Sequence, residues 1–358
     1  MAHIGCAVLA LAGVAGVVQA QVDDRISPDG SIRLDGVELP LSDLMSEEGR
    51  EYLRHLIIDK PFGTAVPDLA DERARQDGIM FAFLEPMRQR YAVEIAEQRI
   101  GGIVVDVVTP AAGIAPENAD RVLINVHGGG FVTGARSASL VESVPLAALM
   151  RIKVVSVDYG MGPEHQFPAA SQDVAAVYRE LLKEYDAARI GLYGCSAGGL
   201  LAAQSIAWFQ ANSLPAPGAV GVFCASLSGY TGGDATALAG ALTGYLPQPS
   251  AVTDRAGPPP PQGPTYMGEA EATDPLAYPL ASADVTAQFP PTLFISGTRS
   301  FEFSAALNSH NALARLGVET SFHGWDGMFH GFIYNSELPE SREAYAIMVD
   351  FFQTHLGD

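Results

Sequence analysis

The sequence predicts an α/β fold in which helices flank a mostly parallel sheet. From about residue 100 onward, short runs of β-branched residues alternate with helical stretches, which is typical of strand–helix–strand units. Several of these runs are apolar throughout, as strands covered on both faces must be. Hydrophobic residues make up 48% of the 358 and charged residues 17%, which favours a packed globule over a disordered chain. The length suits one large domain with an appendage.

The N-terminal segment differs from the rest because residues 4–18 form an uncharged apolar run, followed by small residues at Val18 and Ala20. This pattern resembles a secretory signal peptide over residues 1–20, and it predicts a periplasmic or secreted protein. The run is shorter than the ~20 residues that a spanning helix needs, so we expect no stable membrane insertion after its removal. An uncleaved anchor or a misassigned start stays open, because Met1 to His3 supply only the terminal amine as positive charge.

The next segment, residues 21–91, is predicted to be helical. Apolar residues recur at helical spacing over residues 42–59 and again over residues 71–90. Two such helices could form a lid over a site. The alternative is a helical extension that packs away from any site.

Beyond residue 91, each further strand and helix is predicted from its own pattern. The expected strands are residues 103–108, 122–126, 154–157, 190–193, 219–223, 292–295 and 320–325. The expected helices are residues 169–185, 197–211, 304–316 and 341–356. Residues 247–264 contain four consecutive prolines and are expected to form an irregular loop. Ligands of such sheets bind at the carboxyl ends of the strands, so motifs at those ends indicate function.

The first such motif is Gly194-Cys195-Ser196-Ala197-Gly198, which follows a predicted strand and precedes a predicted helix. A serine at a sharp strand-to-helix turn needs glycines on either side, since the turn is strained and the helix packs close beneath it. The unpaired N–H groups at the start of the helix favour an oxyanion nearby. Ser196 is therefore a candidate nucleophile, and a glycine-rich turn without a function is the alternative.

The second motif, His127-Gly128-Gly129-Gly130, also follows a predicted strand. Three consecutive glycines cost conformational entropy unless the backbone itself must approach something. Backbone N–H groups aimed at the oxygen of a tetrahedral intermediate supply that reason, and losing one such donor typically costs ~2.7–4 kcal/mol of barrier. We expect Gly129, Gly130 and Ala197 to form an oxyanion hole, with Gly128 as a further candidate, and His127 to brace the loop. A flexible surface turn is the alternative.

A serine nucleophile also needs a base within hydrogen-bond reach. Of the eight histidines, His330 lies in a loop just past the last predicted strand, where its side chain can reach the carboxyl edge of the sheet. The other histidines have local explanations as loop, helix or strand residues, or lie near a chain end. His330 is therefore the predicted base.

Together these motifs resemble those of the hormone-sensitive-lipase family of α/β-hydrolases, the bacterial short-chain carboxylesterases. Residues 158–168 are similar to the family segment D-Y-R-L-A-P-E-H-P-F-P, and residues 274–276 and 327–330 also match the family. The resemblance covers the chain from about residue 92 to its end and implies an α/β-hydrolase fold with an N-terminal helical cap. The implied division is a signal peptide at residues 1–20, a helical cap at 21–91 and a catalytic domain at 92–358.

Three positions depart from the family pattern. Cys195 precedes the nucleophile where the family has aspartate or threonine, and we expect a small apolar filler there rather than a reactive thiol. Gly160 replaces an arginine, so whatever that side chain braces in relatives must be braced otherwise here. Ser300 stands where the family's catalytic acid usually follows the penultimate strand.

The acid must therefore come from elsewhere, and the fold's chain order places it between Ser196 and His330. Glu302, which lies between two aromatic residues, is the predicted acid. Its longer side chain can span the displacement, and a carboxylate is needed to fix the histidine tautomer and to stabilise imidazolium. The alternatives are a solvated Glu302 in a site that has lost its acid, and Asp326 as a reserve acid.

The charge balance restricts the partners of this chain. With 41 acidic and 21 basic residues the net charge is −20, which repels phosphate backbones, so no nucleic-acid partner is expected.

The predicted triad indicates a serine esterase that acts on a small-molecule ester through an acyl-enzyme. No metal or organic cofactor is expected. A preference for short acyl chains is implied only by the resemblance. Two alternatives stay open, a non-catalytic small-molecule binding protein and a hydrolase of an amide, carbamate, lactone or acetylated sugar. The oligomeric state is open too, a homodimer included.

Overall fold

The computed structural model describes residues 36, 38–59, 68–229, 232–243, 266–268 and 270–357. The chain divides into two compact units, Met1–Pro40 and Leu41–Asp358, and the helices and strands that are described all lie in the second. The signal segment expected at residues 1–20 and the loop expected at residues 247–264 lie outside the described residues, so both stay predictions. In the described part of the chain, no helix combines the length and the apolar composition that crossing a bilayer requires.

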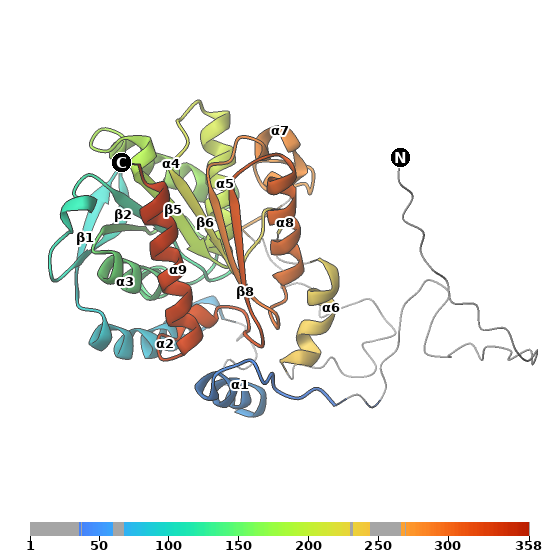
Figure 1. The fold of residues 1–358 in the computed structure, drawn as a ribbon. Coiled ribbons are helices and arrows are strands. Elements are labelled where there is room, and N and C mark those ends of the chain that lie inside the picture. The colour runs from blue at the N-terminus through green and yellow to red at the C-terminus, as the bar shows by residue number, and fades with distance from the viewer. Residues whose placement is uncertain are drawn as a thin grey trace, which may run out of the picture. The chain divides into compact units, whose positions relative to one another are not determined.

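An eight-stranded sheet forms the centre of the second unit, in the order β1-β2-β4-β3-β5-β6-β7-β8 (Figure 1). The strands are β1 (Val93–Ile100), β2 (Ile103–Pro110), β3 (Val122–Val126), β4 (Lys153–Val157), β5 (Ile190–Cys195), β6 (Ala219–Phe223), β7 (Thr292–Gly297) and β8 (Thr320–Trp325). β2 runs antiparallel to both β1 and β4, and all the other neighbouring pairs are parallel. The predicted α/β class with a mostly parallel sheet is confirmed.

β1 is not among the predicted strands, and its place at the sheet edge explains why. All eight of its residues are exposed or half-buried. An edge strand has a neighbour on one side only and tolerates charged side chains, so its sequence lacks the apolar run of a central strand. The turn from β1 to β2 is made by Gly101 and Gly102, both with positive φ (60° and 83°), as a two-residue hairpin requires.

Helices cover both faces of the sheet (Figure 1). They are α1 (Glu47–Asp59), α2 (Leu69–Arg90), α3 (Ala138–Met150), α4 (Ala169–Leu181), α5 (Ala197–Ala211), α6 (Gly233–Leu242), α7 (Ala283–Thr286), α8 (Phe303–Arg315) and α9 (Pro339–His355). Helices α4, α5 and α8 pack on one face, whereas α3 and α9 pack on the other, together with α1 and α2. The helices predicted from periodicity are confirmed to within a few residues at their ends.

Helix α3 is missing from the sequence prediction because it has no polar stripe. Its side chains are buried around most of its circumference, and Pro145 lies inside it. A helix that is apolar on all sides shows no 3.6-residue period, and an internal proline argues against a helix. This omission matters because α3 carries Glu142, a buried charged residue.

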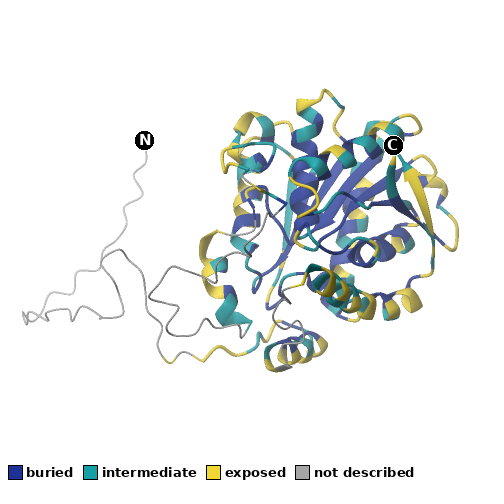
Figure 2. Cartoon of the chain, turned by 180° about the vertical axis from the view of Figure 1, so that it is seen from behind, coloured by how far each residue is buried: buried dark blue, intermediate teal, exposed yellow. Residues whose placement is uncertain are grey.

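The centre of the sheet forms a rigid platform, since β3, β5 and β6 are buried along their whole length. Successive side chains point to opposite faces: Ile124 packs in the core shared with α4 and α5, and Leu123 in the core shared with α3 and α9. Figure 2 shows buried residues on the central strands and exposed residues on the outer sides of the helices. Loops at the carboxyl ends of these strands therefore start from fixed positions.

The two helices expected N-terminal to the sheet are present as α1 and α2. Asp68 caps α2 by accepting hydrogen bonds from the amides of Ala70 and Asp71. Arg73 of α2 forms an ion pair with Glu164 at 2.7 Å, which links α2 to a loop beyond β4. The compact unit Leu41–Asp358 contains both the helices and the sheet, and the domain boundaries at residues 20 and 91 stay predictions.

Candidate active site

Ser196 lies at a sharp turn between β5 and α5, as the glycine pattern predicts. Its backbone has φ 57° and ψ −123°, a conformation that residues with side chains rarely adopt. A Cβ atom at Gly194 would lie 2.1 Å from the Val126 carbonyl oxygen, and a Cβ at Gly198 would lie 1.8 Å from the same atom. Both glycines are therefore required by close backbone packing. The Ser196 amide donates to the Phe223 carbonyl at 2.8 Å, which ties the turn to β6.

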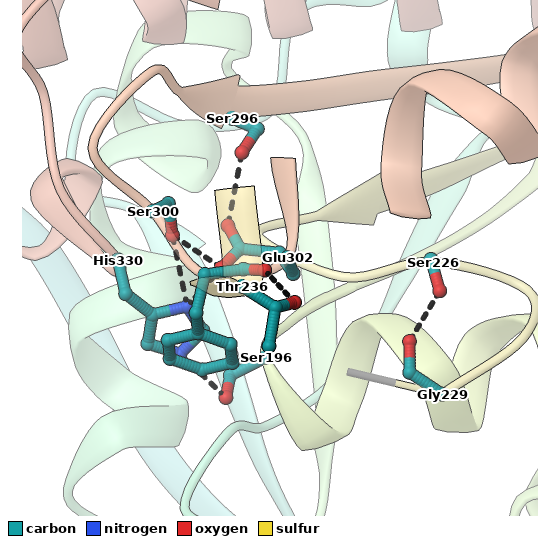
Figure 3. A network of polar contacts seen from close by, with 9 residues as sticks. Ser196, Ser226, Gly229, Thr236, Ser296, Ser300, Glu302 and His330 are labelled. Carbon is teal, nitrogen blue, oxygen red and sulfur yellow. Dashed lines mark hydrogen bonds and ion pairs between the residues drawn. The ribbon is translucent and has the colours of Figure 1, made fainter. Parts of the chain in front are cut away.

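The structure brings Ser196, His330 and Glu302 into one hydrogen-bonded row (Figure 3). His330 Nε2 lies 2.9 Å from Ser196 Oγ, and His330 Nδ1 lies 2.9 Å from Glu302 Oε2. The Glu302 carboxylate is fully buried, whereas 27% of the His330 side chain is exposed. With Nδ1–H donating to the carboxylate, Nε2 is free to accept the serine proton.

The loop after β7 holds the Glu302 carboxylate in place. Ser296 Oγ donates to Glu302 Oε1 at 2.9 Å, and Ser300 Oγ donates to Oε2. Burial would raise the pKa of Glu302, but the charge and hydrogen bond of His330, with the hydrogen bond of Ser300, lower it below its ordinary value. Glu302 is therefore ionised at neutral pH.

The alternatives weighed for the acid do not hold in the structure. Glu302 is buried and not solvated. Asp326 accepts from Thr298 Oγ1 at 3.0 Å and from Ser42 Oγ, so its carboxylate is engaged away from His330. Ser300 occupies the position of the missing family carboxylate, and its hydroxyl lies 3.5 Å from His330 Nδ1 while donating to Glu302. The Glu302 side chain thus extends beyond the Ser300 hydroxyl and contacts His330 Nδ1.

The glycine-rich loop after β3 lies beside Ser196. Gly129 and Gly130 have φ values of 117° and 62°, and a Cβ at Gly129 would lie 2.2 Å from the Thr133 carbonyl oxygen. Within the described residues, no protein acceptor takes the amides of Gly129, Gly130 or Ala197. These three N–H groups are available to a ligand.

Gly128 requires a correction, because its amide already donates to Glu142 Oε1 at 2.8 Å. It has no N–H left for an oxyanion, so Gly128 cannot share the role for which it was a candidate. Glycine is still needed there, since a Cβ would lie 2.5 Å from the Tyr334 hydroxyl. His127 is a bracing residue: its ring stacks on Tyr159 at 4.3 Å, and Nδ1 lies 2.8 Å from the Gly128 carbonyl oxygen. Burial lowers the pKa of His127 to about 4, so this ring is neutral.

A cavity of about 610 Å³ opens onto Ser196 and His330. Its lining is largely apolar and includes Leu53 and Leu56 of α1 and Met80 and Phe83 of α2, together with residues of α6 and of the loops after β7 and β8. The N-terminal helices therefore contribute to the wall of the cavity, and the alternative of an extension packed away from any site is wrong. An apolar cavity with few polar groups suits a small organic ligand.

The two departures from the family pattern at Cys195 and Gly160 have local explanations. Cys195 and Cys224 are both buried free thiols, and burial raises the pKa of the Cys195 thiol, which fits an apolar filler. A Cβ at Gly160 would lie 2.9 Å from the His165 ring, so histidine occupies the space beside this glycine. Among the described residues, no group of three or more histidine, cysteine, aspartate or glutamate side chains could hold a metal ion.

Sequence reasoning missed three residues at this site. Phe301 stacks on the His330 ring with centroids 4.5 Å apart, and Tyr334 lines the cavity. Glu142 lies under the glycine loop. The available signal for Glu142 was a single charge within the apolar segment 138–150.

Comparisons with known proteins agree with this geometry. A family described as alpha/beta hydrolase fold matches residues 123–334. The chain is 28% identical over 282 residues to an acetyl-hydrolase of Streptomyces hygroscopicus, covering 75% of this chain and 90% of that protein. The crystal structure of an esterase, E25, has a TM-score of 0.76 at 27% identity and covers 91% of this chain and 99% of its own. An esterase from the bacterial hormone-sensitive lipase family has a TM-score of 0.73 at 22% identity, covering 87% and 99%, and shares the fold.

Proposed function

The chain belongs to the alpha/beta hydrolase family, and from this premise we propose that it is a serine carboxylesterase of the hormone-sensitive-lipase type that hydrolyses short-chain carboxylic esters. The observation that carries the proposal is the continuous row from Ser196 Oγ through His330 to the buried Glu302, with both gaps at 2.9 Å. A nucleophile, its base and the group that orients the base are recognised by this geometry.

In the proposed reaction, Ser196 Oγ attacks the ester carbonyl while His330 Nε2 takes its proton. The amides of Gly129, Gly130 and Ala197 receive the negative oxygen of the tetrahedral intermediate. His330 then returns the proton to the leaving alcohol, which leaves the acyl group on Ser196. Water attacks this acyl-enzyme by the same route in reverse, releases the acid and restores the serine.

Two further observations support this function over its alternatives. A binding protein needs no base aimed at a serine, whereas here His330 is within hydrogen-bond distance of Ser196 and fixed by a buried carboxylate. The relative at 27% identity is named as an esterase, which favours an ester bond over an amide or carbamate, and the relative at 28% identity is named as an acetyl-hydrolase, which favours a small acyl group.

The test is hydrolysis of p-nitrophenyl esters of increasing acyl length by the purified chain and by Ser196→Ala. We expect turnover of short-chain esters by the unchanged chain and a kcat at least ~10⁴-fold lower in the variant. The matched control is Ser171→Ala, because Ser171 is a buried serine of α4 that does not line the cavity. Equal rates for Ser196→Ala and the control would overturn the proposal.

A further inference from the structure

Glu142 is a buried carboxylate on α3 that touches both loops of the proposed active site. Its Oε1 accepts from the Gly128 amide at 2.8 Å and from the Tyr334 hydroxyl at 2.9 Å. Its Oε2 accepts from Asn125 Nδ2 at 2.9 Å and from the Cys195 amide at 3.2 Å. The two backbone amides belong to the residues immediately before Gly129 and Ser196 in the chain. One side chain therefore connects the glycine loop to the nucleophile turn.

The surroundings of Glu142 match a charged carboxylate and supply no counter-ion. An ionised carboxylate is an acceptor only, and four donors face it, two on each oxygen. In the described part of the chain, no lysine, arginine or histidine forms an ion pair with it. Removing the acceptor would leave these buried donors without a partner, which is costly because a buried donor loses its hydrogen bond to water as well.

The other ionisable groups around Glu142 stay neutral near pH 7. They are Tyr193 and Cys195 of β5, Tyr334 of the short helix η5 (Phe332–Tyr334), and Tyr345 of α9; β3 contributes the uncharged Asn125. Burial raises the pKa of all four. Burial also raises the pKa of Glu142 to about 7, against the lowering effect of its four hydrogen bonds. Glu142 is therefore the group of this cluster that changes charge in the neutral range.

We propose that Glu142 is a positioning residue of the esterase, whose ionised carboxylate fixes the glycine loop at the correct distance from the nucleophile turn. The inference rests on the proposed function. Gly129 and Ala197 must present their amides to one oxygen atom, yet they lie on different segments of the chain. Glu142 accepts hydrogen bonds from Gly128, the residue before Gly129, and from Cys195, two residues before Ala197. When Glu142 takes up a proton, one of its oxygens becomes a donor that faces donors, and the connection weakens. A displacement of about 1 Å can cost ~10²-fold in rate.

The first test is Glu142→Gln, which keeps the shape and places an NH₂ group against two of the donors. We expect kcat for p-nitrophenyl acetate to fall ~10–100-fold while KM changes less than about threefold, because ground-state binding does not use the oxyanion donors. The matched control is Asp106→Asn. Asp106 and Glu142 are both 5% exposed, but Asp106 lies on β2 and binds no amide of the glycine loop or of the nucleophile turn. Its ion-pair partner is Arg136 at 3.5 Å, an exposed side chain near the start of α3, so the Asp106 variant should keep the rate of the unchanged chain.

The pH profile separates this role from general damage to the fold. With a pKa of about 7, the ionised share of Glu142 falls about tenfold between pH 8 and pH 6. In the unchanged chain, kcat should fall with this ionised share. Glu142→Gln lacks this titrating carboxyl group, so its kcat should fall about tenfold less than that of the unchanged chain over the same interval. An identical kcat and an identical pH profile in the two proteins would overturn the inference.

Tyr334→Phe keeps the inference testable even if Glu142→Gln does not fold. This variant removes one donor to the charged carboxylate and leaves the other three, so the acidic limb of kcat should move to higher pH. An unmoved limb in Tyr334→Phe would contradict the role of Glu142. Failure of the proposed function has a different signature, because the unchanged chain and Ser196→Ala would then have equal rates, and both proposals would fall together.

Discussion

Replacing Glu302 by glutamine tests whether this residue is the acid of the proposed triad. Glu302 lies two residues after Ser300, the position at which the family usually carries the acid. The substitution keeps the volume of a fully buried side chain but removes the charge 2.9 Å from His330 Nδ1. Ser296 and Ser300 both donate to the present carboxylate. A glutamine must therefore turn its NH₂ group either toward the Ser296 hydroxyl or toward the Ser300 hydroxyl and His330 Nδ1 together, and the second choice selects the wrong tautomer.

The expected loss follows from the geometry. An imidazolium and a carboxylate about 4 Å apart between charge centres attract each other by about 4 kcal/mol at an effective dielectric constant of 20. Because each 1.36 kcal/mol of barrier is a factor of ten, this loss alone is ~10³ in kcat. Selection of the wrong tautomer brings the total to ~10⁴, as for the asparagine variant of a serine-protease triad. KM should change little, since the charge acts in the transition state.

The assay is steady-state hydrolysis of p-nitrophenyl acetate by Glu302→Gln, Ser300→Ala and the double variant Ser300→Asp, Glu302→Gln. Ser300→Ala should lose less than about tenfold, because it removes one hydrogen bond to Glu302 and leaves the carboxylate. The double variant should recover part of the activity, since Ser300 Oγ lies 3.5 Å from His330 Nδ1 and an aspartate there restores a charge. Full activity in Glu302→Gln, or an equal loss in Ser300→Ala, would refute the assignment.

Three further outcomes follow from the packing. Gly198→Ala should lower the free energy of unfolding by about 3–5 kcal/mol in urea titrations, because its Cβ would lie 1.8 Å from the Val126 carbonyl oxygen. The control is Gly78→Ala, which should not destabilise α2 because the space around its Cβ is open. The raised pKa of Glu142, about 7, means that its contribution to stability is full below about pH 4.5 and is lost as the pH rises through 7. The unfolding free energy of Glu142→Gln minus that of the unchanged chain should therefore rise by about 3 kcal/mol between about pH 4 and pH 9. A difference that does not change with pH would contradict this. The Cys195 thiol should react with Ellman's reagent only after unfolding, and rapid reaction of the native chain would show that it is accessible.

Residues at the carboxyl ends of central strands were predictable because their local sequence is constrained. Ser196 is marked by glycines that close packing requires, and His330 by its place after the last strand. Glu302 could be inferred because Ser300 left the histidine without a carboxylate. The fold class followed from buried strands whose apolar runs are visible in the sequence.

The missed features have no local signal of that kind. β1 is polar because it is an edge strand, and α3 has no amphipathic stripe because it is buried on most sides. The error at Gly128 depends on α3, since the group that takes its amide, Glu142, lies fourteen residues away on that helix. Which of several adjacent glycine amides is free depends on a tertiary contact, and glycine spacing carries no information about it.

The most direct measurement of the central claim is the site of covalent labelling by a substrate-like inhibitor. We would treat the chain with a p-nitrophenyl phosphonate, measure its intact mass and map the modified peptide. The account predicts one adduct per chain, on Ser196, that is absent in Ser196→Ala and that forms at least ~10³-fold more slowly in Glu302→Gln. A label on any other residue, or equal labelling of Ser196→Ala, would contradict it.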